Sequence, residues 1–160
     1  MKRPLLVLSS AACLMSLTGA CETDLVDDPS FQLWCGDELC AWDLEDGEIR
    51  KVSTWHDYDY GVELVGAPVV LSQQSRDIAS CVRVEVTSQV EANAEVSVEV
   101  DEEGDGEIDW VIPVEASEDF VRRVKDVSLY VSTDGVFYVR KTGPGQAVVG
   151  RLRISEECRD

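Results

Sequence analysis

The sequence predicts an all-β domain, an antiparallel two-sheet β-sandwich, on three observations. Short runs rich in Val, Ile and aromatic residues recur along most of the chain. Two of these runs, residues 79–88 and 94–100, alternate strictly between apolar and polar side chains, as half-buried strands do. Turn residues such as Asp134-Gly135 and Gly143-Pro144-Gly145 separate the runs. About ten short strands, each with one apolar face, favour a sandwich over a barrel.

The expected strands follow one another with short connections. In chain order they cover residues 39–43, 49–53, 61–65, 68–73, 79–88, 94–100, 108–114, 127–132, 136–142 and 147–155. The segment 117–126 remains ambiguous. Ser117 is a suitable N-cap for one helical turn with Phe120 and Val124 on one face, but a bent strand fits the same residues.

The N-terminus has the layout of a secretory signal peptide over residues 1–20. Lys2 and Arg3 are followed by an apolar stretch at 5–17, which is too short to span a membrane, and then by small residues up to Cys21. The stretch ending in Thr18-Gly19-Ala20-Cys21 resembles the lipobox of bacterial lipoproteins, although Thr18 stands where Leu is commonest. An ordinary cleavable signal with a coincidental cysteine is the alternative.

The lipobox resemblance implies that acyl chains such as palmitate are attached at Cys21 and anchor the protein to a membrane. Glu22 does not match the Asp that usually retains such proteins at the inner membrane, so the resemblance implies the outer membrane, facing the periplasm or the cell surface. Residues 21–30, which are acidic and contain Pro29, are expected to form a lipidated tether. Residues 31–160 are then the folded domain, a length typical of one hydrophobic core.

The chain is strongly acidic. It has 32 Asp and Glu against 14 Lys and Arg, a net charge of −18, and loss of Lys2 and Arg3 with the signal would make it −20. Such a field repels nucleic acid, so no nucleic-acid partner is expected. The acidity serves solubility, or it attracts divalent cations or basic partners.

Four cysteines follow Cys21, an even number in an exported chain, and they predict two disulfides. Three pairings are open. Cys35 with Cys40 around a short loop, and Cys81 with Cys158, is the favoured set. A zinc site is disfavoured because the chain has one histidine and no C-x-x-C pair.

The densest group of polar aromatic residues lies in a predicted loop between two strands. The candidate ligand-binding residues are Trp55, His56, Asp57, Tyr58 and Asp59. An aromatic face there would stack on a sugar ring while His and Asp exchange hydrogen bonds with hydroxyls. The alternative is structural, with Trp55 closing one end of the sandwich. No G-x-S-x-G accompanies the His–Asp pair, so no catalytic residue is assigned.

A second acidic segment, residues 101–109, falls between two strands. Asp101, Asp105 and Asp109 are candidate oxygen ligands for a structural calcium. The segment is not an EF-hand, because Ile112 occupies the place of the bidentate Glu. An acidic turn built on Asp105-Gly106 is the alternative. The tryptophans outside the aromatic loop, Trp34, Trp42 and Trp110, are expected to pack structurally.

Residues 35–158 resemble the galactose-binding-like jelly rolls used by carbohydrate-binding modules. The resemblance rests on Gly47-Glu48-Ile49, on Gly61-Val62-Glu63-Leu64, on the valine-rich central strands and on residues 141–149. It implies a disulfide-stabilised jelly roll that binds polysaccharide without catalysis. The alternatives are an adhesion or envelope-assembly lipoprotein that binds a protein, and a hydrolase built around His56.

Overall fold

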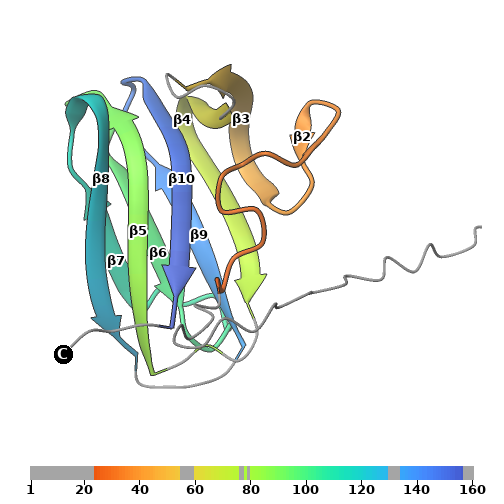
Figure 1. The fold of residues 1–160 in the computed structure, drawn as a ribbon, viewed down its shortest axis with the longest axis vertical. Coiled ribbons are helices and arrows are strands. Elements are labelled where there is room, and N and C mark those ends of the chain that lie inside the picture. Colours follow the sequence, from red (N-terminus) through yellow and green to blue (C-terminus); the bar gives the residue numbers. More distant parts are fainter. Residues whose placement is uncertain (1–23, 55–59, 76–77, 79, 130–133, 157–160) are drawn as a thin grey trace, which may run out of the picture.

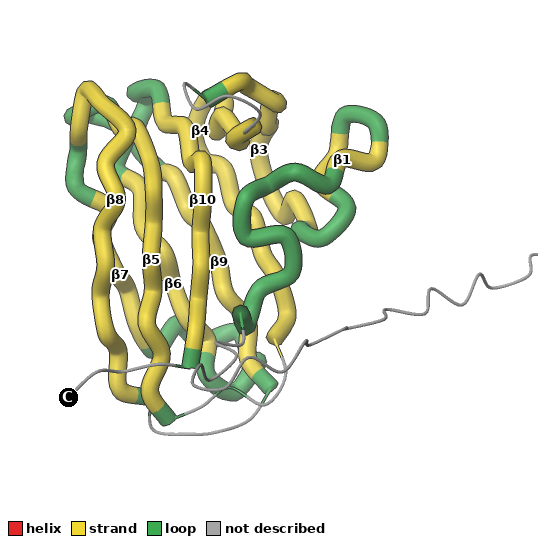
Figure 2. The backbone as a smooth tube through the Cα atoms, in the orientation of Figure 1, coloured by secondary structure: helices red, strands yellow, loops and turns green. Residues whose placement is uncertain are grey.

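The computed structural model describes residues 24–54, 60–75, 78, 80–129 and 134–156. These residues form ten β-strands and no helix, in the predicted antiparallel jelly roll (Figures 1 and 2). In this part of the chain, no helix is long and apolar enough to cross a membrane.

The strands pack in two layers (Figure 1). One layer contains β8, β5, β10 and the first half of β4, and the other contains β7, β6, β9 and the second half of β4. β3 runs beside β4, and β1 and β2 form a separate hairpin. The bounds are β1 Trp34–Cys35, β2 Glu38–Leu39, β3 Asp43–Ser53, β4 Tyr60–Ser75, β5 Cys81–Val90, β6 Val96–Asp101, β7 Trp110–Val114, β8 Ser117–Ser128, β9 Gly135–Lys141 and β10 Ala147–Ser155.

A single long strand, β4, belongs to both layers. Its residues 62–64 pair with β10, and its residues 69–75 pair with β9. Between the two parts lie Gly66, with φ of 73°, and Pro68 after a cis peptide bond. β3 follows this bend through two register shifts between Leu44 and Glu48. The predicted strands 61–65 and 68–73 are therefore one bent strand.

A buried lysine supports the bend. The Lys141 side chain is fully buried, and its Nζ donates a hydrogen bond to the carbonyl oxygen of Gly66. Burial lowers the pKa of Lys141 below its ordinary value. The bend leaves the Gly66 carbonyl without a partner in the strand pairing, and the Lys141 side chain supplies the hydrogen bond instead.

The N-terminal segment fills the space beside β10 that β4 leaves when it enters the other layer. The Leu25 amide donates to the carbonyl of Ile154, and the Leu152 amide donates to that of Pro29 at 2.7 Å. Val26 and Phe31 are buried in the core. The part of the expected tether that is described, residues 24–30, is therefore packed against the domain, because its apolar side chains close the sandwich.

The core confirms the alternation that the sequence predicted. Val82, Val84 and Val86 of β5 are buried beneath the layer, and β6 contributes Val96, Val98 and Val100 in the same way. Trp42 is also buried, with its ring centroid 5.5 Å from that of Phe31. The ambiguous segment 117–126 is a strand, since it pairs with β5 along nearly its whole length as part of β8.

One predicted disulfide is confirmed directly. Cys35 and Cys40 are bonded, and their Cα atoms are 5.3 Å apart. Cys81 is also disulfide-bonded. Its expected partner, Cys158, lies outside the described residues, so that pairing stays a prediction.

Two glycines at the bend provide a test of its packing. Both have positive φ, but a Cβ on Gly47 would lie 2.4 Å from the carbonyl oxygen of Pro68, whereas a Cβ on Gly66 meets no atom within 4 Å. We expect Gly66→Ala to cost about 1 kcal/mol of unfolding free energy through backbone strain alone, and Gly47→Ala to cost more than about 3 kcal/mol. Denaturant unfolding of both variants measures this, and equal costs would contradict the close packing at Gly47.

Candidate functional site

The aromatic loop predicted as the ligand site lies between β3 and β4. Trp55, His56, Asp57, Tyr58 and Asp59 are outside the described residues, so their role stays a prediction. The residues that flank them are described. Ser53 and Tyr60 are paired across the two strands, and Tyr60 is 42% exposed.

Two aromatic rings next to this loop share one cation. The Nζ of Lys51, on β3, lies 4.0 Å from the ring centroid of Tyr60 and 5.8 Å from that of Trp34. Trp34 comes from β1, so the hairpin brings its indole beside the β3–β4 pair. The cation is attracted by the negative face of each ring, which holds the three side chains together.

A groove of about 580 Å³ lies between the hairpin and β3. Trp34 and Lys51 contribute to its wall, together with Asp37, Glu48 and Arg50. The groove therefore combines an indole ring with carboxylate, ammonium and guanidinium groups, which are acceptors and donors of hydrogen bonds for a ligand. We call Trp34, Lys51, Tyr60 and this groove the hairpin site.

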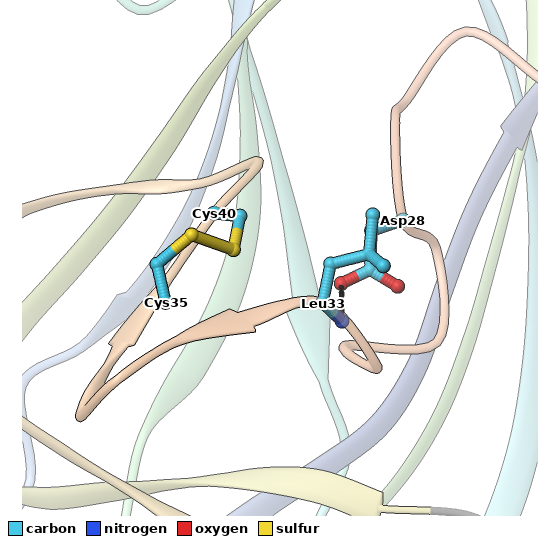
Figure 3. Close-up of a disulfide and its surroundings, with 4 residues drawn as sticks. All are labelled: Asp28, Leu33, Cys35 and Cys40. Atoms are coloured by element: carbon cyan, nitrogen blue, oxygen red, sulfur yellow. Dashed lines mark hydrogen bonds between the residues drawn. A yellow bond between two sulfur atoms is a disulfide. The ribbon is translucent and has the colours of Figure 1, made fainter.

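The hairpin is fixed in place by a disulfide and by one carboxylate (Figure 3). The Cys35–Cys40 bond closes the hairpin that carries Trp34. The Asp28 carboxylate accepts hydrogen bonds from the backbone amides of Gln32 and Leu33, each at 2.8 Å, and Figure 3 shows the bond from Leu33. The indole Nε1 of Trp34 donates to the carbonyl of Phe31. Trp34 is thus held by its backbone and by its side chain.

Gln32 connects the hairpin to the start of β4. Its side-chain amide nitrogen donates to the carbonyl of Tyr60 at 2.9 Å, and its amide oxygen accepts from the Tyr60 backbone at 3.4 Å. Tyr60 is therefore positioned from the hairpin side as well as through its strand. The hydrogen bonds and the disulfide that position Trp34 and Tyr60 all join residues between 28 and 60.

The outer face of the β6–β9 layer carries a second polar and aromatic surface. In the strand register, Tyr138 lies between Ser72 and Glu99. Burial raises the pKa of Tyr138, and the charges of Asp101 and Glu45 raise it further. Arg140 donates to Glu99 at 2.8 Å. We call this surface the Tyr138 face.

The acidic segment expected to hold calcium is organised by its own backbone. The Asp101 carboxylate accepts from the amides of Gly104, Asp105 and Gly106, and the Asp109 carboxylate accepts from Glu102. Within the described ranges, no three His, Cys, Asp or Glu side chains are grouped to hold a metal ion. Calcium binding by Asp101, Asp105 and Asp109 stays a prediction.

Sequence reasoning assigned Trp34 to packing and did not single out Lys51. The structure places both in the hairpin site, although the Trp34 ring also contacts the core. A tryptophan beside a cysteine of a short disulfide loop is a signal for an exposed, rigid hairpin. Lys51 has no comparable local signal, since its contact with Trp34 depends on a distant pairing of segments.

Several solved structures have similar folds. TmCBM61, solved with β-1,4-galactotriose, is 14% identical, with a TM-score of 0.59 over 84% of this chain and 99% of its own. A carbohydrate-binding module of Cellvibrio mixtus lichenase 5A, solved with cellotriose, is 16% identical, with a TM-score of 0.54 over 72% of this chain and 91% of its own. The chain has the jelly-roll fold of these modules.

The same fold also occurs within a larger enzyme. The enzymatically active domain of tailspike protein 4 from bacteriophage CBA120 is 11% identical, with a TM-score of 0.63 over 82% of this chain and 21% of its own. No family model matches the sequence, and no curated protein matches it. At these identities the similarity concerns the fold alone.

The disulfide of the hairpin site is open to a direct test. Replacing both Cys35 and Cys40 by Ser frees the loop that carries Trp34. We expect a loss of roughly 2 kcal/mol of unfolding free energy on the loop-entropy model. Urea unfolding checks this, with Ser128→Ala, an exposed serine at the end of β8, as the control. An unchanged unfolding midpoint would show that the hairpin is held without its disulfide.

Proposed function

We propose that this protein is a non-catalytic, polysaccharide-binding module that engages its ligand at the hairpin site. The observation that carries the proposal is the pair of rings, Trp34 and Tyr60, fixed on either side of Lys51 beside a polar groove. A sugar presents apolar C–H faces to aromatic rings and hydroxyls to charged groups. The similar structures include modules solved with bound oligosaccharides, which supports the choice of ligand class.

The predicted aromatic loop extends the same proposal. Residues 55–59 connect Thr54 to Tyr60, so their backbone starts and ends beside the hairpin site. We propose that Trp55 and Tyr58 add aromatic surface to it, while His56, Asp57 and Asp59 bind hydroxyls.

The proposal is tested by binding of soluble β-1,4-galactan, xylan and cellotriose. Tyr60→Ala removes an exposed ring and is expected to weaken binding at least about tenfold, near 1.4 kcal/mol. We expect the same loss for Trp34→Ala. Tyr138→Ala, an aromatic truncation on another face, is the matched control and should bind as the native protein does. Affinity electrophoresis and calorimetry measure the change.

Two results would overturn this assignment. Absence of saturable binding to every glycan would discard the ligand class. Loss of binding in Tyr138→Ala with normal binding in Tyr60→Ala would move the glycan site to the Tyr138 face. Trp55→Ala reports separately on the loop.

A protein partner is the second candidate, and the Tyr138 face favours it. Glu45, Glu99 and Asp101 place negative charge near the tyrosine; Glu99 pairs with Arg140 and Asp101 is buried, so the exposed Glu45 is the carboxylate that suits a basic partner surface. This face would then bind a protein while the hairpin site stays empty. The hydrolase alternative depends on His56, which lies outside the described residues.

We also propose that Cys21 carries a lipid that anchors the domain to the outer membrane. Asp24 is fixed to β10, because its carboxylate accepts from the Ile154 amide and pairs with Arg153. Burial raises the pKa of Asp24, and these two contacts oppose that rise. Asp24 is three positions after Cys21 in the sequence, a reach of about 11 Å at full extension. The domain would therefore lie close to the membrane surface.

Metabolic labelling with tritiated palmitate tests the anchor. We expect label in the native protein and none in Cys21→Ser, which lacks the acceptor thiol. Cys13→Ser, a cysteine change in the same N-terminal stretch, is the matched control and should keep the label. Equal labelling of Cys21→Ser and the native protein would exclude Cys21 as the lipidation site.

A further inference from the structure

The sandwich is open on the side opposite the β4 bend. There β7 and β8 end the strand order of the two layers, and a groove of about 840 Å³ lies between them. Val84, Val86 and Val127 form its buried floor. We call this the edge groove, and neither the hairpin site nor the Tyr138 face shares a residue with it.

The walls of the edge groove are apolar and reach the surface. β7 contributes Trp110, Ile112 and Val114, of which Trp110 and Ile112 are partly buried against the core. At the rim, Val111 is 60% exposed and Val124 is 47% exposed. Five residues of β7 extend about 17 Å, so the apolar wall suits an elongated aliphatic chain.

Two cations face this apolar groove from β8. Arg123 and Lys125 stand opposite Val86 and Val84 in the register, so their side chains leave β8 on the core-facing side. Both residues line the groove. Inward-pointing charges also protect an edge strand against pairing with another sheet, so the two cations alone do not identify a ligand site.

These cations are also unpaired in a chain that is rich in carboxylates. Five other arginines, Arg50, Arg83, Arg122, Arg140 and Arg153, form ion pairs in the described structure. Over the same residues, no ion pair includes Arg123 or Lys125, and Arg123 contacts only the carbonyls of Val121 and Ala116.

Two carboxylates line the edge groove as well. Asp126 is engaged by Arg83 through two hydrogen bonds of 2.8 and 2.9 Å, and this pairing lowers the pKa of Asp126. Glu115 is exposed and follows the last residue of β7. The charge of Lys125 also lowers the pKa of Asp126, but the hydrogen-bonded ion pair of Asp126 is with Arg83, and no ion pair in the described structure includes Arg123 or Lys125.

We propose that the edge groove binds a fatty-acid-like ligand, a linear aliphatic chain ending in a carboxylate. The chain would lie along Val84, Val86, Ile112 and Trp110, where apolar burial favours it. The carboxylate would pair with Arg123 and Lys125 at the mouth. The net charge of −18 repels anions at long range, so both the apolar contact and the two cations are needed for binding.

The test is a titration of dodecanoate into the purified protein carrying Cys21→Ser, so that no acyl group of its own competes. We expect saturable one-to-one binding by calorimetry and a change in tryptophan fluorescence from Trp110. Dodecanol, which has the same chain without the charge, should bind at least about fivefold more weakly.

The double variant Arg123→Gln, Lys125→Gln should weaken dodecanoate binding about tenfold and leave dodecanol binding unchanged. Arg151→Gln, which removes an exposed arginine of β10 outside the groove, is the matched control. Val124→Glu supplies a second variant on the exposed rim, where folding is not at risk, and should also weaken dodecanoate binding. Thermal melting confirms that each variant is folded.

Several outcomes would overturn the proposal. The first is the absence of saturable dodecanoate binding by the native protein. The second is that the double variant and Val124→Glu both bind dodecanoate as tightly as the native protein does. A dimer that forms with concentration, is blocked by Val124→Glu and is unaffected by dodecanoate would assign the groove to a second copy of the chain instead.

Discussion

The bend of β4 is the constraint on which the rest of the structure depends. One strand pairs with β10 in one layer and with β9 in the other, so the layers are joined by hydrogen bonds along β4 as well as by side-chain packing. The bend takes the Gly66 carbonyl out of the strand pairing, and the fully buried Lys141 reaches across to it. Gly47 of β3 permits the close approach to Pro68 that the bend requires. Gly47, Gly66 and Lys141, which lie on three different strands, thus stabilise the same bend.

This bend makes the two sides of the sandwich different. On the bent side, β3, the N-terminal segment and the disulfide hairpin cover the core, and their contacts assemble Trp34, Lys51 and Tyr60. On the other side β7 and β8 are not paired with each other in the described structure, and the edge groove lies between them beside the short connection 115–116 that joins the two layers. The hairpin site and the edge groove therefore lie on opposite sides of one core.

The local features of the fold were predictable from sequence. The valines of β5 and β6 indicated which face of each strand is buried, because side chains alternate between the two faces of a strand and every second one here is a valine. The closeness of Cys35 and Cys40 in sequence favoured their pairing among the three sets that were open, and the structure confirms this disulfide. β8 was ambiguous since it is an edge strand, with Arg122, Arg123 and Lys125 interrupting the apolar pattern that a central strand would show.

What escaped the sequence depends on contacts between distant segments. Residues 24–30 looked like a tether because only Leu25 and Val26 are aliphatic, yet their place is decided by the space that β4 vacates beside β10. Lys51 contacts Trp34 of a hairpin that lies earlier in the chain, whereas the sequence predicted for Trp34 only a structural role, in the core or against a disulfide. The aromatic loop at 55–59 was predicted as a ligand site from its composition, and Ser53 and Tyr60, which flank it, are paired between β3 and β4.

The pairing of Asp24 with Ser155 sets the two ends of the described domain side by side. A domain whose chain enters and leaves at neighbouring points can be inserted into a surface loop of another protein without forcing that loop apart. The domain is equally suited to circular permutation, in which the two ends are joined and the chain is opened at a turn that leaves the bend of β4 intact. This architecture is therefore suited to being moved between host proteins as a unit.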